Sequence, residues 1–585
     1  MKRNLFIGLA ATLVTLAWSS LSLSESLIAD AIYLNGKIVT ANDRFDFVQA
    51  LAIKDGRIIA LGPNAKVRGL AGKSTRIVDL KGNTVLPGFY DNHIHLGEAV
   101  QEWRGGLVPA ASEWQRDAHS LEELLESVRR RAATTPKGQW IRGAIIREEW
   151  FNQRVPTRWD LDKVAPDHPV ALVRGPHTLI ANSLALEKAG INEKTPDPEG
   201  GWIFKDEQGV PNGRVLEAAR RLVAKVMPTE ARGQSDDEIL QRYRVHLGKL
   251  AALGITSVNI AGVFPSDLRL IQALYERWGS ELPRATVMLR MRPGHDAFDD
   301  MELAVKSTIA EINSLGVRTG FGNDRVKIGG IKMSVDGGLS APVFWSTQPY
   351  KGRPDFHGSQ RIPDDNFYRV AKRAHELGWQ VGVHTMGDGA VQMVVNQLER
   401  ILKELPRADH RHHLHHVFVL PDKAMLSKMA ANKILVASQP GFTLGLGAYA
   451  AEALDMEREQ HQNPTKSLLN HGIRVSYGSD GAPYGPLLTI ATAVTRKGYD
   501  GKVYGPDEAI SVREAIRFHT YESAYLTFDE KQRGSLEIGK VADLVVLGGD
   551  ILSVPAERIP QIPVLRTVVD GREIFVSERA TASVP

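Results

Sequence analysis

The 585-residue sequence contains no cysteine. Disulfides, thiolate nucleophiles and zinc sites with sulfur ligands are therefore excluded. Any metal site must use histidine, carboxylates or a group derived from another side chain. A chain without thiols also suits an oxidising compartment.

An excess of charge of either sign is also missing, because 72 Lys and Arg residues stand against 68 Asp and Glu residues. This balance gives no argument for a nucleic-acid partner, and we expect a small-molecule partner instead. Hydrophobic residues make up 43% of the chain and charged residues 24%, which predicts a large folded core rather than disorder. The composition leaves open whether the chain forms a homo-oligomer.

Long apolar runs are absent outside the N-terminus. There, Lys2 and Arg3 precede the run LFIGLAATLVTLAW, and the small residues of SLSLSES offer a cleavage site after Ser24. Because the run is short for a membrane span, which usually takes about 20 residues, a cleaved signal peptide over 1–24 is favoured over a retained anchor. We therefore expect an exported protein, periplasmic or secreted, without membrane attachment after cleavage.

Short segments of alternating polar and apolar residues lie near both ends of the chain. They occur at 30–43 and 47–63, and again at 534–550 and 564–576, with Asn-Gly and Asp-Gly turn signals among them. We predict one small β-sandwich domain built from both termini, with its two parts at 25–85 and 531–585.

The long middle of the chain alternates strand-like and helix-like segments, which is typical of a (β/α)₈ TIM barrel. We assign the barrel to 86–530 and treat the turn-rich region from about 100 to 240 as an insertion over its mouth. The eight expected strands are 84–95, 255–262, 284–291, 326–337, 379–388, 411–420, 434–442 and 473–481.

His93 and His95 follow an apolar run within LPGFYDNHIHLGEA. Residues i and i+2 of a strand point to the same face, so the two imidazoles project together. They stand at the C-terminal end of the first barrel strand, where the active sites of such barrels lie. Two imidazoles at this place are suited to holding one metal cation.

Three further candidates stand at the C-terminal ends of other expected strands. His384 ends the fifth strand, His416 lies in the sixth and Asp480 ends the eighth. This shared position favours a joint metal site over separate core residues.

The segment HRHHLHHV holds five histidines, which would also suit a solvated loop or a weak nonspecific metal site. Only one face of a strand can line the barrel. His416 is the favoured ligand, and His415 is the alternative. We expect His412, Leu414 and His416 to share one face, and His413 and His415 to share the other.

The fourth strand contributes a lysine rather than a histidine. An ammonium group has no lone pair for a metal, so a lysine becomes a ligand only as a carbamate formed with CO₂. Lys327 and Lys332 are five residues apart and face opposite ways on a regular strand, which leaves the choice open. The residues alone favour a lysine that forms a salt bridge near Asp336.

Together these motifs resemble the amidohydrolase superfamily, and most of all amidohydrolase family 3. The resemblance runs from about residue 30 to 578. It rests on NGKIVT, LPGFYDNHIH, IKMSVDGG, VHTMGDGAV and GSLEIGKVADLVVL, among other segments. It implies a (β/α)₈ barrel with one or two divalent metal ions, usually zinc, and a β-sandwich made from both termini.

The resemblance also implies roles for individual residues. Lys332 matches the lysine that is carboxylated in related enzymes, and His177, in GPHTLIANSLAL, matches a recurrent histidine of the inserted region that faces the site. Two departures concern the substrate preference: His415 stands where the family usually has Glu, and Gly481 interrupts the usual S-D-A-P. The implied metal ligands are His93, His95, Lys332, His384, His416 and Asp480.

The predicted reaction is metal-assisted hydrolysis of an amide-like C–N bond in a small molecule. Asp480 would take a proton from the attacking water and deliver it to the leaving nitrogen. His177 would help to stabilise the charge that develops on the carbonyl oxygen. Hydrolysis of an ester or lactone, deamination of a ring, and a catalytically idle binding or regulatory protein are the alternatives, and the sequence names no substrate.

Overall fold

The computed structural model describes residues 28–96, 120–144, 156–174, 177–228, 235–339, 343–481 and 484–581. The expected signal peptide over 1–24 lies outside this part of the chain. Within these ranges, no helix has both the length and the apolar character that crossing a bilayer requires.

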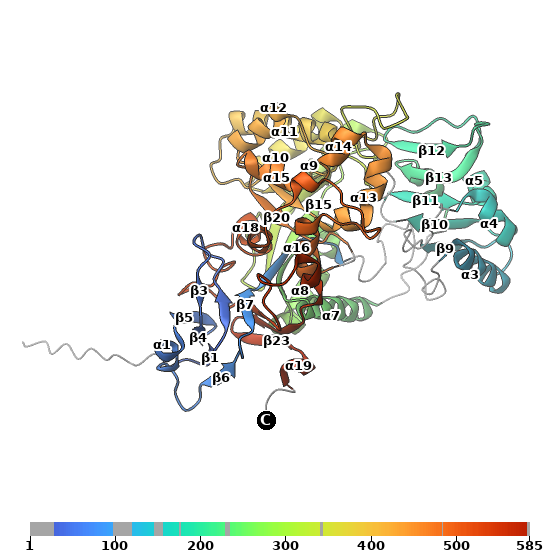
Figure 1. Cartoon of the computed structure of the whole chain (residues 1–585). Helices are drawn as coiled ribbons and strands as arrows, with labels where there is room; N and C mark the ends of the chain where they lie inside the picture. Colours follow the sequence, from blue (N-terminus) through green and yellow to red (C-terminus); the bar gives the residue numbers. More distant parts are fainter. Residues whose placement is uncertain are drawn as a thin grey trace, which may run out of the picture.

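Eight parallel strands form the centre of the molecule (Figure 1). An isolated parallel bridge between Ile94 and Asp480 links the first strand to the segment after the last, so the barrel is nearly closed. The eight expected strands are all present, and the predicted (β/α)₈ architecture is confirmed. The strands are β8 (Phe89–Ile94), β14 (Ile255–Val263), β15 (Arg284–Arg290), β16 (Val326–Ser334), β17 (Val381–Thr385), β18 (His413–His416), β19 (Leu435–Ser438) and β20 (Val475–Tyr477).

Helices follow the strands and cover the outside of the barrel (Figure 1). In α11, apolar residues recur every three or four positions, and Val391, Val394, Leu398 and Ile401 are buried against the strands. The helices of this layer are α7 (Asp236–Ala252), α8 (Leu268–Trp278), α9 (Met301–Ser314), α10 (Asp364–Glu376), α11 (Asp388–Glu404), α12 (Lys423–Ala431), α13 (Gly441–Ala453), α14 (Met456–Gln460), α15 (Thr465–Asn470), α16 (Pro486–Thr495), α17 (Val512–Phe518) and α18 (Tyr521–Leu526).

Strands from the two ends of the chain meet in a second domain, at the lower left of Figure 1. One sheet has the order β5-β4-β1-β6 and the other β23-β22-β21-β7-β2-β3. The pairing of β7 with β21 joins the two termini. The strands are β1 (Ala31–Leu34), β2 (Lys37–Val39), β3 (Phe47–Val48), β4 (Ala50–Lys54), β5 (Arg57–Gly62), β6 (Arg76–Asp79), β7 (Thr84–Pro87), β21 (Leu544–Leu547), β22 (Val564–Val569) and β23 (Arg572–Val576), with α1 (Asn64–Arg68) and α19 (Glu578–Thr581) beside them.

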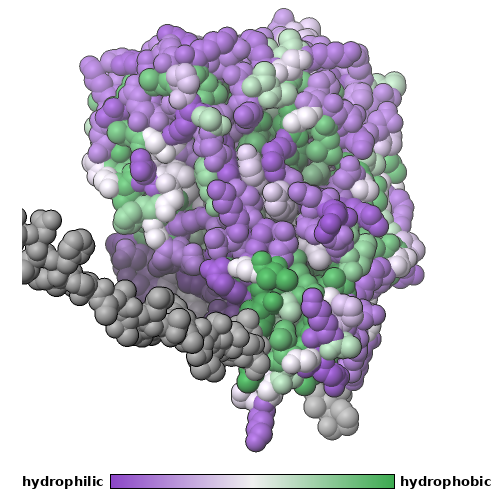
Figure 2. All heavy atoms as spheres, turned by 90° about the vertical axis from the view of Figure 1, so that its left-hand side faces the viewer, coloured by the Kyte–Doolittle hydropathy of each residue, from purple (hydrophilic) through white to green (hydrophobic). Residues whose placement is uncertain are grey.

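The two sheets share a hydrophobic core. Tyr33 and Leu51 of one sheet pack with Val85, Leu544 and Val568 of the other. The surface of this side of the molecule is mostly hydrophilic, with apolar side chains in small patches (Figure 2). The arrangement agrees with the expected β-domain made from both termini.

A buried ion pair attaches this domain to the N-terminal end of the barrel. Arg284 begins β15 and donates from Nε to Asp543 Oδ2 over 2.7 Å and from Nη2 to Asp543 Oδ1 over 3.1 Å. Both side chains are almost fully buried, at 4% and 3% exposed. A buried, doubly hydrogen-bonded pair of this kind fixes the orientation of its two segments.

Between β8 and α7 the chain forms an inserted unit with its own five-stranded sheet, at the right of Figure 1. The strand order is β12-β13-β11-β10-β9, and the insertion expected at about 100–240 contains this sheet. Its elements are α3 (Leu121–Thr134), β9 (Ile141–Ala144), α4 (Arg158–Val164), β10 (Val170–Arg174), β11 (Thr178–Ala181), α5 (Ser183–Lys188), β12 (Gly201–Lys205), β13 (Pro211–Glu217) and α6 (Arg220–Ala224).

Candidate metal centre

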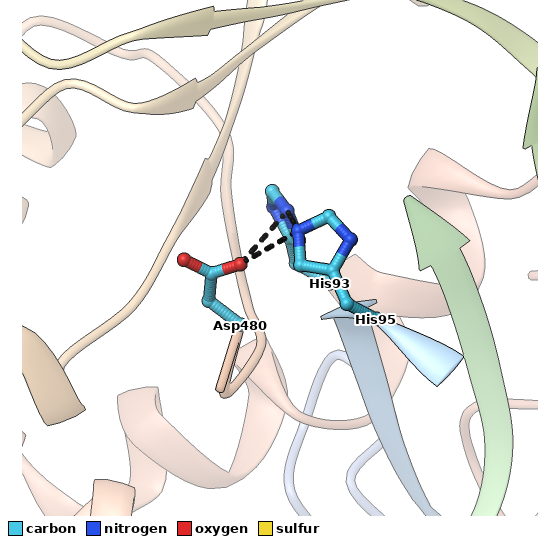
Figure 3. Close-up of side chains that lie close together, drawn as sticks. All are labelled: His93, His95 and Asp480. Atoms are coloured by element: carbon cyan, nitrogen blue, oxygen red, sulfur yellow. Dashed lines mark hydrogen bonds and ion pairs between the residues drawn. The ribbon is translucent and has the colours of Figure 1, made fainter. Parts of the chain in front are cut away.

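Three predicted site residues converge where the first and last strands of the barrel meet (Figure 3). His93 and His95 come from the end of β8, and Asp480 follows β20. The Oδ1 atom of Asp480 lies 3.2 Å from His93 Nε2 and 3.0 Å from His95 Nε2. The two Nε2 atoms are 3.2 Å apart, so three potential ligand atoms surround one point.

The backbone around Asp480 is shaped to make this meeting possible. Its φ of +64° is unusual for a residue with a side chain. Its N–H donates to His93 O over 2.6 Å. Gly478 allows the close approach of the strands, because a Cβ there would lie 2.5 Å from His93 N. The local geometry therefore serves the contact between Asp480 and the His93 strand.

His384 and His416 extend the cluster along the barrel mouth. Their ring centroids are 4.5 Å apart, and the His416 ring lies 5.0 Å from that of His93. His416 Nδ1 donates to Gln439 Oε1 over 2.6 Å, which leaves its Nε2 with a lone pair. His384 Nε2 lies 3.3 Å from Gly337 O.

Lys332 also faces this cluster from β16. It is 4% exposed, and its Nζ has no hydrogen-bond partner among the described residues. Asp336 accepts hydrogen bonds from the backbone N–H groups of Met386, Gly387 and Trp345 instead. The salt bridge near Asp336 that the residues alone favoured is therefore wrong.

The alternative lysine of β16, Lys327, forms hydrogen bonds outside the histidine cluster. Lys327 Nζ donates to Asp529 Oδ1 and to Thr527 O, each over 2.7 Å. It stands at the start of β16, away from the C-terminal strand ends. Of the two lysines, only Lys332 lies with the histidine cluster.

His177 approaches the cluster from the inserted sheet. Its ring centroid lies 6.1 Å from that of His384, and its Nδ1 is 2.8 Å from Glu217 Oε1. The structure thus brings all of the predicted site residues to one end of the barrel, with His177 at the edge.

The five-histidine segment divides in a way that the simple alternation did not predict. His413 and His415, not His412, point into the barrel, where a Cβ on Gly382 would lie 2.6 Å from His413 Nε2. His415 is in turn 4.4 Å from the His93 ring. His416 also reaches the site because its φ is +77°, which breaks the strand alternation. The expectation that His412 and His416 share one face is wrong.

The other histidines of this segment form a buried structural network outside the barrel. His412 Nδ1 accepts from the backbone N–H of Val381 over 3.0 Å, so its Nε2–H donates to His375 Nδ1 over 2.9 Å. His410 Nδ1 accepts from the His412 N–H over 2.9 Å, and its Nε2 donates to Asn432 O over 2.9 Å. These bonds satisfy both ring nitrogens of His410 and His412.

Comparison with known proteins agrees with this geometry. The model of a family described as amidohydrolase matches residues 76–575. The chain belongs to the amidohydrolase family. The N-substituted formamide deformylase of Arthrobacter pascens is 30% identical to it, over 93% of this chain and 97% of that protein.

Two further similarities extend over most of this amidohydrolase. A solved structure of an uncharacterized metal-dependent hydrolase from Pyrococcus furiosus superposes with a TM-score of 0.63 at 25% identity, covering 89% of this chain and all of that one. Protein LONG AFTER FAR-RED 3 of Arabidopsis thaliana is 27% identical over 96% of this chain and 94% of that protein. The chain is therefore a metal-dependent hydrolase of this family.

The charge states within the amidohydrolase site suit metal binding. Burial lowers the pKa of His93 and His384 well below the ordinary value, and that of His416 to about 3. Burial alone would raise the pKa of Asp480, but the hydrogen bond with His95 and neighbouring charges lower it to about 2. Neutral imidazoles and an ionised carboxylate are the forms that bind a cation.

The chemical types of the potential ligand atoms also suit a zinc ion. His93, His95 and Asp480 place nitrogen and oxygen ligands around one point, and these are ligand types that zinc accepts. Gln439 fixes the ring of His416 in the tautomer whose Nε2 is free for a metal. Lys332 adds a buried amine that has no competing hydrogen-bond partner among the described residues, and burial lowers its pKa well below the ordinary value.

Sequence reasoning missed most of the residues that support this site, and it gave Asp336 a different role, beside a salt-bridged lysine. The metal cluster is supported by hydrogen bonds to Gln439, Asp336 and Asp91. His177 is contacted by Glu217 and Arg361. Asp91 accepts from the Ser479 N–H over 2.8 Å, tying the first strand to the last. Gln439 lies in the second half of the predicted strand 434–442 and directly follows the observed β19, and this position was the available signal for it. Glu217 and Arg361 carry no such signal, because they lie far along the sequence from the strands of the barrel.

Proposed function

We propose that this protein hydrolyses an amide-like C–N bond of a small molecule with the help of one or two divalent ions, preferably zinc. The observation that carries the proposal is the convergence of His93, His95 and Asp480 within one ligand cluster. The similarity to an N-substituted formamide deformylase supports the choice of bond. A cation bound here would supply an activated water molecule and polarise the carbonyl.

Asp480 is the residue that moves the proton in this proposal. Its carboxylate is ionised near neutral pH and is partly accessible, with 23% of the side chain exposed. It accepts a proton from the attacking water at a carboxylate oxygen and then delivers it to the leaving nitrogen. Its Oδ1 atom faces the Nε2 atoms of His93 and His95 within the ligand cluster.

Lys332 is proposed to be carboxylated on Nζ and to act as a further metal ligand. Burial lowers the pKa of Lys332 well below its ordinary value. A neutral amine is the nucleophilic form that reacts with CO₂, and the carbamate would bring two oxygens into a cluster of imidazoles. Whether one or two ions bind would follow from this modification.

The proposed setting of the enzyme comes from its N-terminal sequence. Residues 1–24 are proposed to direct export and to be removed, which leaves a periplasmic or secreted protein. The proposed partner is a small-molecule substrate, without nucleic acid or membrane, and a homo-oligomer is compatible with this function.

The main experiment uses the mature chain, which begins at residue 25. Its zinc content is measured by mass spectrometry, and hydrolysis of an amide and formamide panel is followed with and without a chelator. We expect activity that the chelator abolishes and that Asp480→Asn lowers at least 100-fold. Asp365→Asn, on the exposed face of α10, is the matched control and should leave the activity unchanged.

Three outcomes would contradict the proposal. Hydrolysis that persists at the same rate in Asp480→Asn would remove the proton-transfer step. Cleavage of esters, lactones or amino-substituted rings, with no amide cleaved, would assign a different bond. A chain that binds no metal when produced with added zinc would support a binding or regulatory role.

The state of Lys332 has its own test. Protein equilibrated with ¹³C-labelled bicarbonate should show a carbamate carbon signal by NMR. The signal should be lost in Lys332→Arg and kept in Lys327→Arg, which changes the other lysine of β16. A signal that persists in Lys332→Arg would exclude carboxylation of Lys332.

A further inference from the structure

Three buried side chains from separate segments meet beside the metal cluster. His177 precedes β11, Glu217 ends β13 and Arg361 lies before α10. His177 Nδ1 is 2.8 Å from Glu217 Oε1, and Arg361 Nη2 contacts the other oxygen of the Glu217 carboxylate. Arg361 Nη2 is also 2.7 Å from His177 Nδ1.

The backbone is arranged to keep this unit together. Glu217 has a φ of +51°, a conformation that costs about 1 kcal/mol for a residue with a side chain. Its N–H donates to His177 O over 3.0 Å, so the two residues are joined through backbone and side chain. Strain that the surrounding structure maintains is a sign of function rather than of packing alone.

The loop after β16 packs closely on the His177 ring, whose centroid lies 6.1 Å from that of His384. A Cβ on Gly338 would lie 2.4 Å from His177 Nε2, and a Cβ on Gly337 would lie 3.0 Å from Glu217 Oε1. The same Gly337 offers its carbonyl oxygen to His384 Nε2 at 3.3 Å. One pair of glycines therefore contacts both His177 and His384.

His177 Nδ1 lies between a group that only accepts and a group that only donates. It can donate to Glu217 Oε1 or accept from Arg361 Nη2, but it cannot do both. His177 Nδ1 lies at Glu217 Oε1, whereas Arg361 Nη2 donates to the other oxygen, Oε2. If Nδ1 accepted from Arg361, the buried charged oxygen Oε1 of Glu217 would lose this donor. If Nδ1 donates to Glu217, one of the five N–H groups of Arg361 loses an acceptor, which costs less free energy. The proton therefore belongs on Nδ1.

We propose that the Glu217–Arg361 pair fixes His177 with its proton on Nδ1, so that Nε2 accepts a hydrogen bond from the substrate N–H. Glu217 and Arg361 are then positioning residues, and the substrates are amides or formamides that keep one hydrogen on nitrogen. The part concerning the substrate rests on the proposed function, whereas the part concerning the tautomer does not.

This assignment differs from the role expected from the sequence. Stabilising an oxyanion requires an N–H directed at it, and Nε2 carries none in this tautomer. Burial has the largest effect on the pKa of His177 and lowers it, in agreement with a neutral ring. The expected role of the ring in the reaction changes from donor to acceptor.

The tautomer is tested by ¹⁵N NMR of the purified mature chain labelled at the histidine rings. The signals of His177 are identified by their loss in His177→Gln. We expect Nδ1 to be protonated and Nε2 to be unprotonated in the wild-type protein. A protonated Nε2, in either the other tautomer or the cation, would overturn the proposal without any variant having to fold.

Glu217→Gln gives a second, sharper readout. The Gln amide oxygen can accept from Arg361 while its NH₂ donates to Nδ1, so the proton of His177 should move to Nε2. Glu508→Gln is the matched control, because Glu508 contacts His461 Nδ1 at 3.1 Å in another part of the chain. Unchanged His177 signals in folded Glu217→Gln would contradict the role of Glu217.

The substrate preference is tested with pairs of formamides that carry one or two substituents on nitrogen. We expect the wild-type protein to prefer the N–H member, and His177→Phe to lower kcat/KM for that member at least 10-fold while sparing the other. An unchanged preference in His177→Phe would overturn the substrate assignment. Absence of all amide cleavage would contradict the proposed function, while the NMR result would still decide the tautomer.

Discussion

His416 and Gln439 are joined by a hydrogen bond of 2.6 Å between Nδ1 and Oε1. The Gln439 amide nitrogen donates to Ala437 O over 2.9 Å, which turns the amide oxygen toward the ring. The tautomer of His416 is therefore fixed by a residue that directly follows the next strand, and its Nε2 is prepared for a cation before one binds.

Replacing Gln439 by Leu should weaken metal binding by roughly 10- to 100-fold, since the ring loses the partner that fixes it. Zinc affinity is measured by competition with a chromophoric chelator. Gln462→Leu is the control, because this glutamine is also fully buried and its side chain has no partner among the described residues. Equal affinities for the two variants would contradict a supporting role for Gln439.

Gly478→Ala should damage both the fold and the metal site. The added Cβ would meet backbone at 2.5 Å from His93 N, and overpacking of this kind costs about 1–3 kcal/mol. Gly248→Ala, in open space within α7, should stabilise the chain by about 0.5–1 kcal/mol. Urea unfolding and zinc content measured on both variants test this, and a Gly478→Ala protein with full stability and metal content would refute it.

The network of His375, His410 and His412 should make stability fall in mild acid. Burial lowers the pKa of His410 to about 4. Below about pH 6.5 the His410 imidazole is protonated in the unfolded chain but not in the folded chain. The free energy of unfolding therefore falls from pH 6.5 to about pH 4, and the contribution of this group then levels off. Burial lowers the pKa of His375 and His412 as well.

His410→Gln tests this contribution, because the amide can still accept from the His412 N–H and donate to Asn432 O. Urea midpoints at pH 7.5, 6 and 4.5 should decline less steeply in the variant than in the wild-type protein. Parallel declines in the two proteins would show that the pKa of His410 is the same in the folded and unfolded chains.

Asp543→Asn should loosen the attachment between the β-domain and the barrel. The change removes one of the two carboxylates that pair with the buried Arg284 and leaves Asp570 as the other, so the cost should lie below the roughly 3–5 kcal/mol typical of a broken buried pair. Thermal unfolding should show a clear loss of stability. Asp550→Asn breaks the more exposed pair with Lys37 and should have a much smaller effect, and similar losses in both variants would contradict the special weight of the buried pair.

The barrel was predictable because its signal is local and repeated. Buried parallel strands are apolar runs, and helices such as α11 show a period near 3.6 residues, so each segment predicts its own structure. The strand ends then predict which side chains meet, and the described positions of His93, His384 and Asp480 agree. The same reasoning indicated that strands from both termini share a domain.

The finer geometry could not be predicted because it depends on departures from regular backbone. His416 reaches the cluster through a positive φ, which a strict alternation of strand faces does not contain. Glu217 and Arg361 are brought to His177 by the packing of the inserted sheet on the barrel, a long-range contact without a local pattern. Whether Lys332 forms a salt bridge with Asp336 likewise depended on the backbone N–H groups that the fold places around Asp336.

The pairing of β7 with β21 also sets an order of events during synthesis. β7 leaves the ribosome early, but its partner Leu544–Leu547 is translated only after the whole barrel. Until then, Val85 and its neighbours form an open strand edge, and the core that Tyr33 and Leu51 share with the C-terminal strands is incomplete. The domain that contains β1 is thus the last one that can be finished.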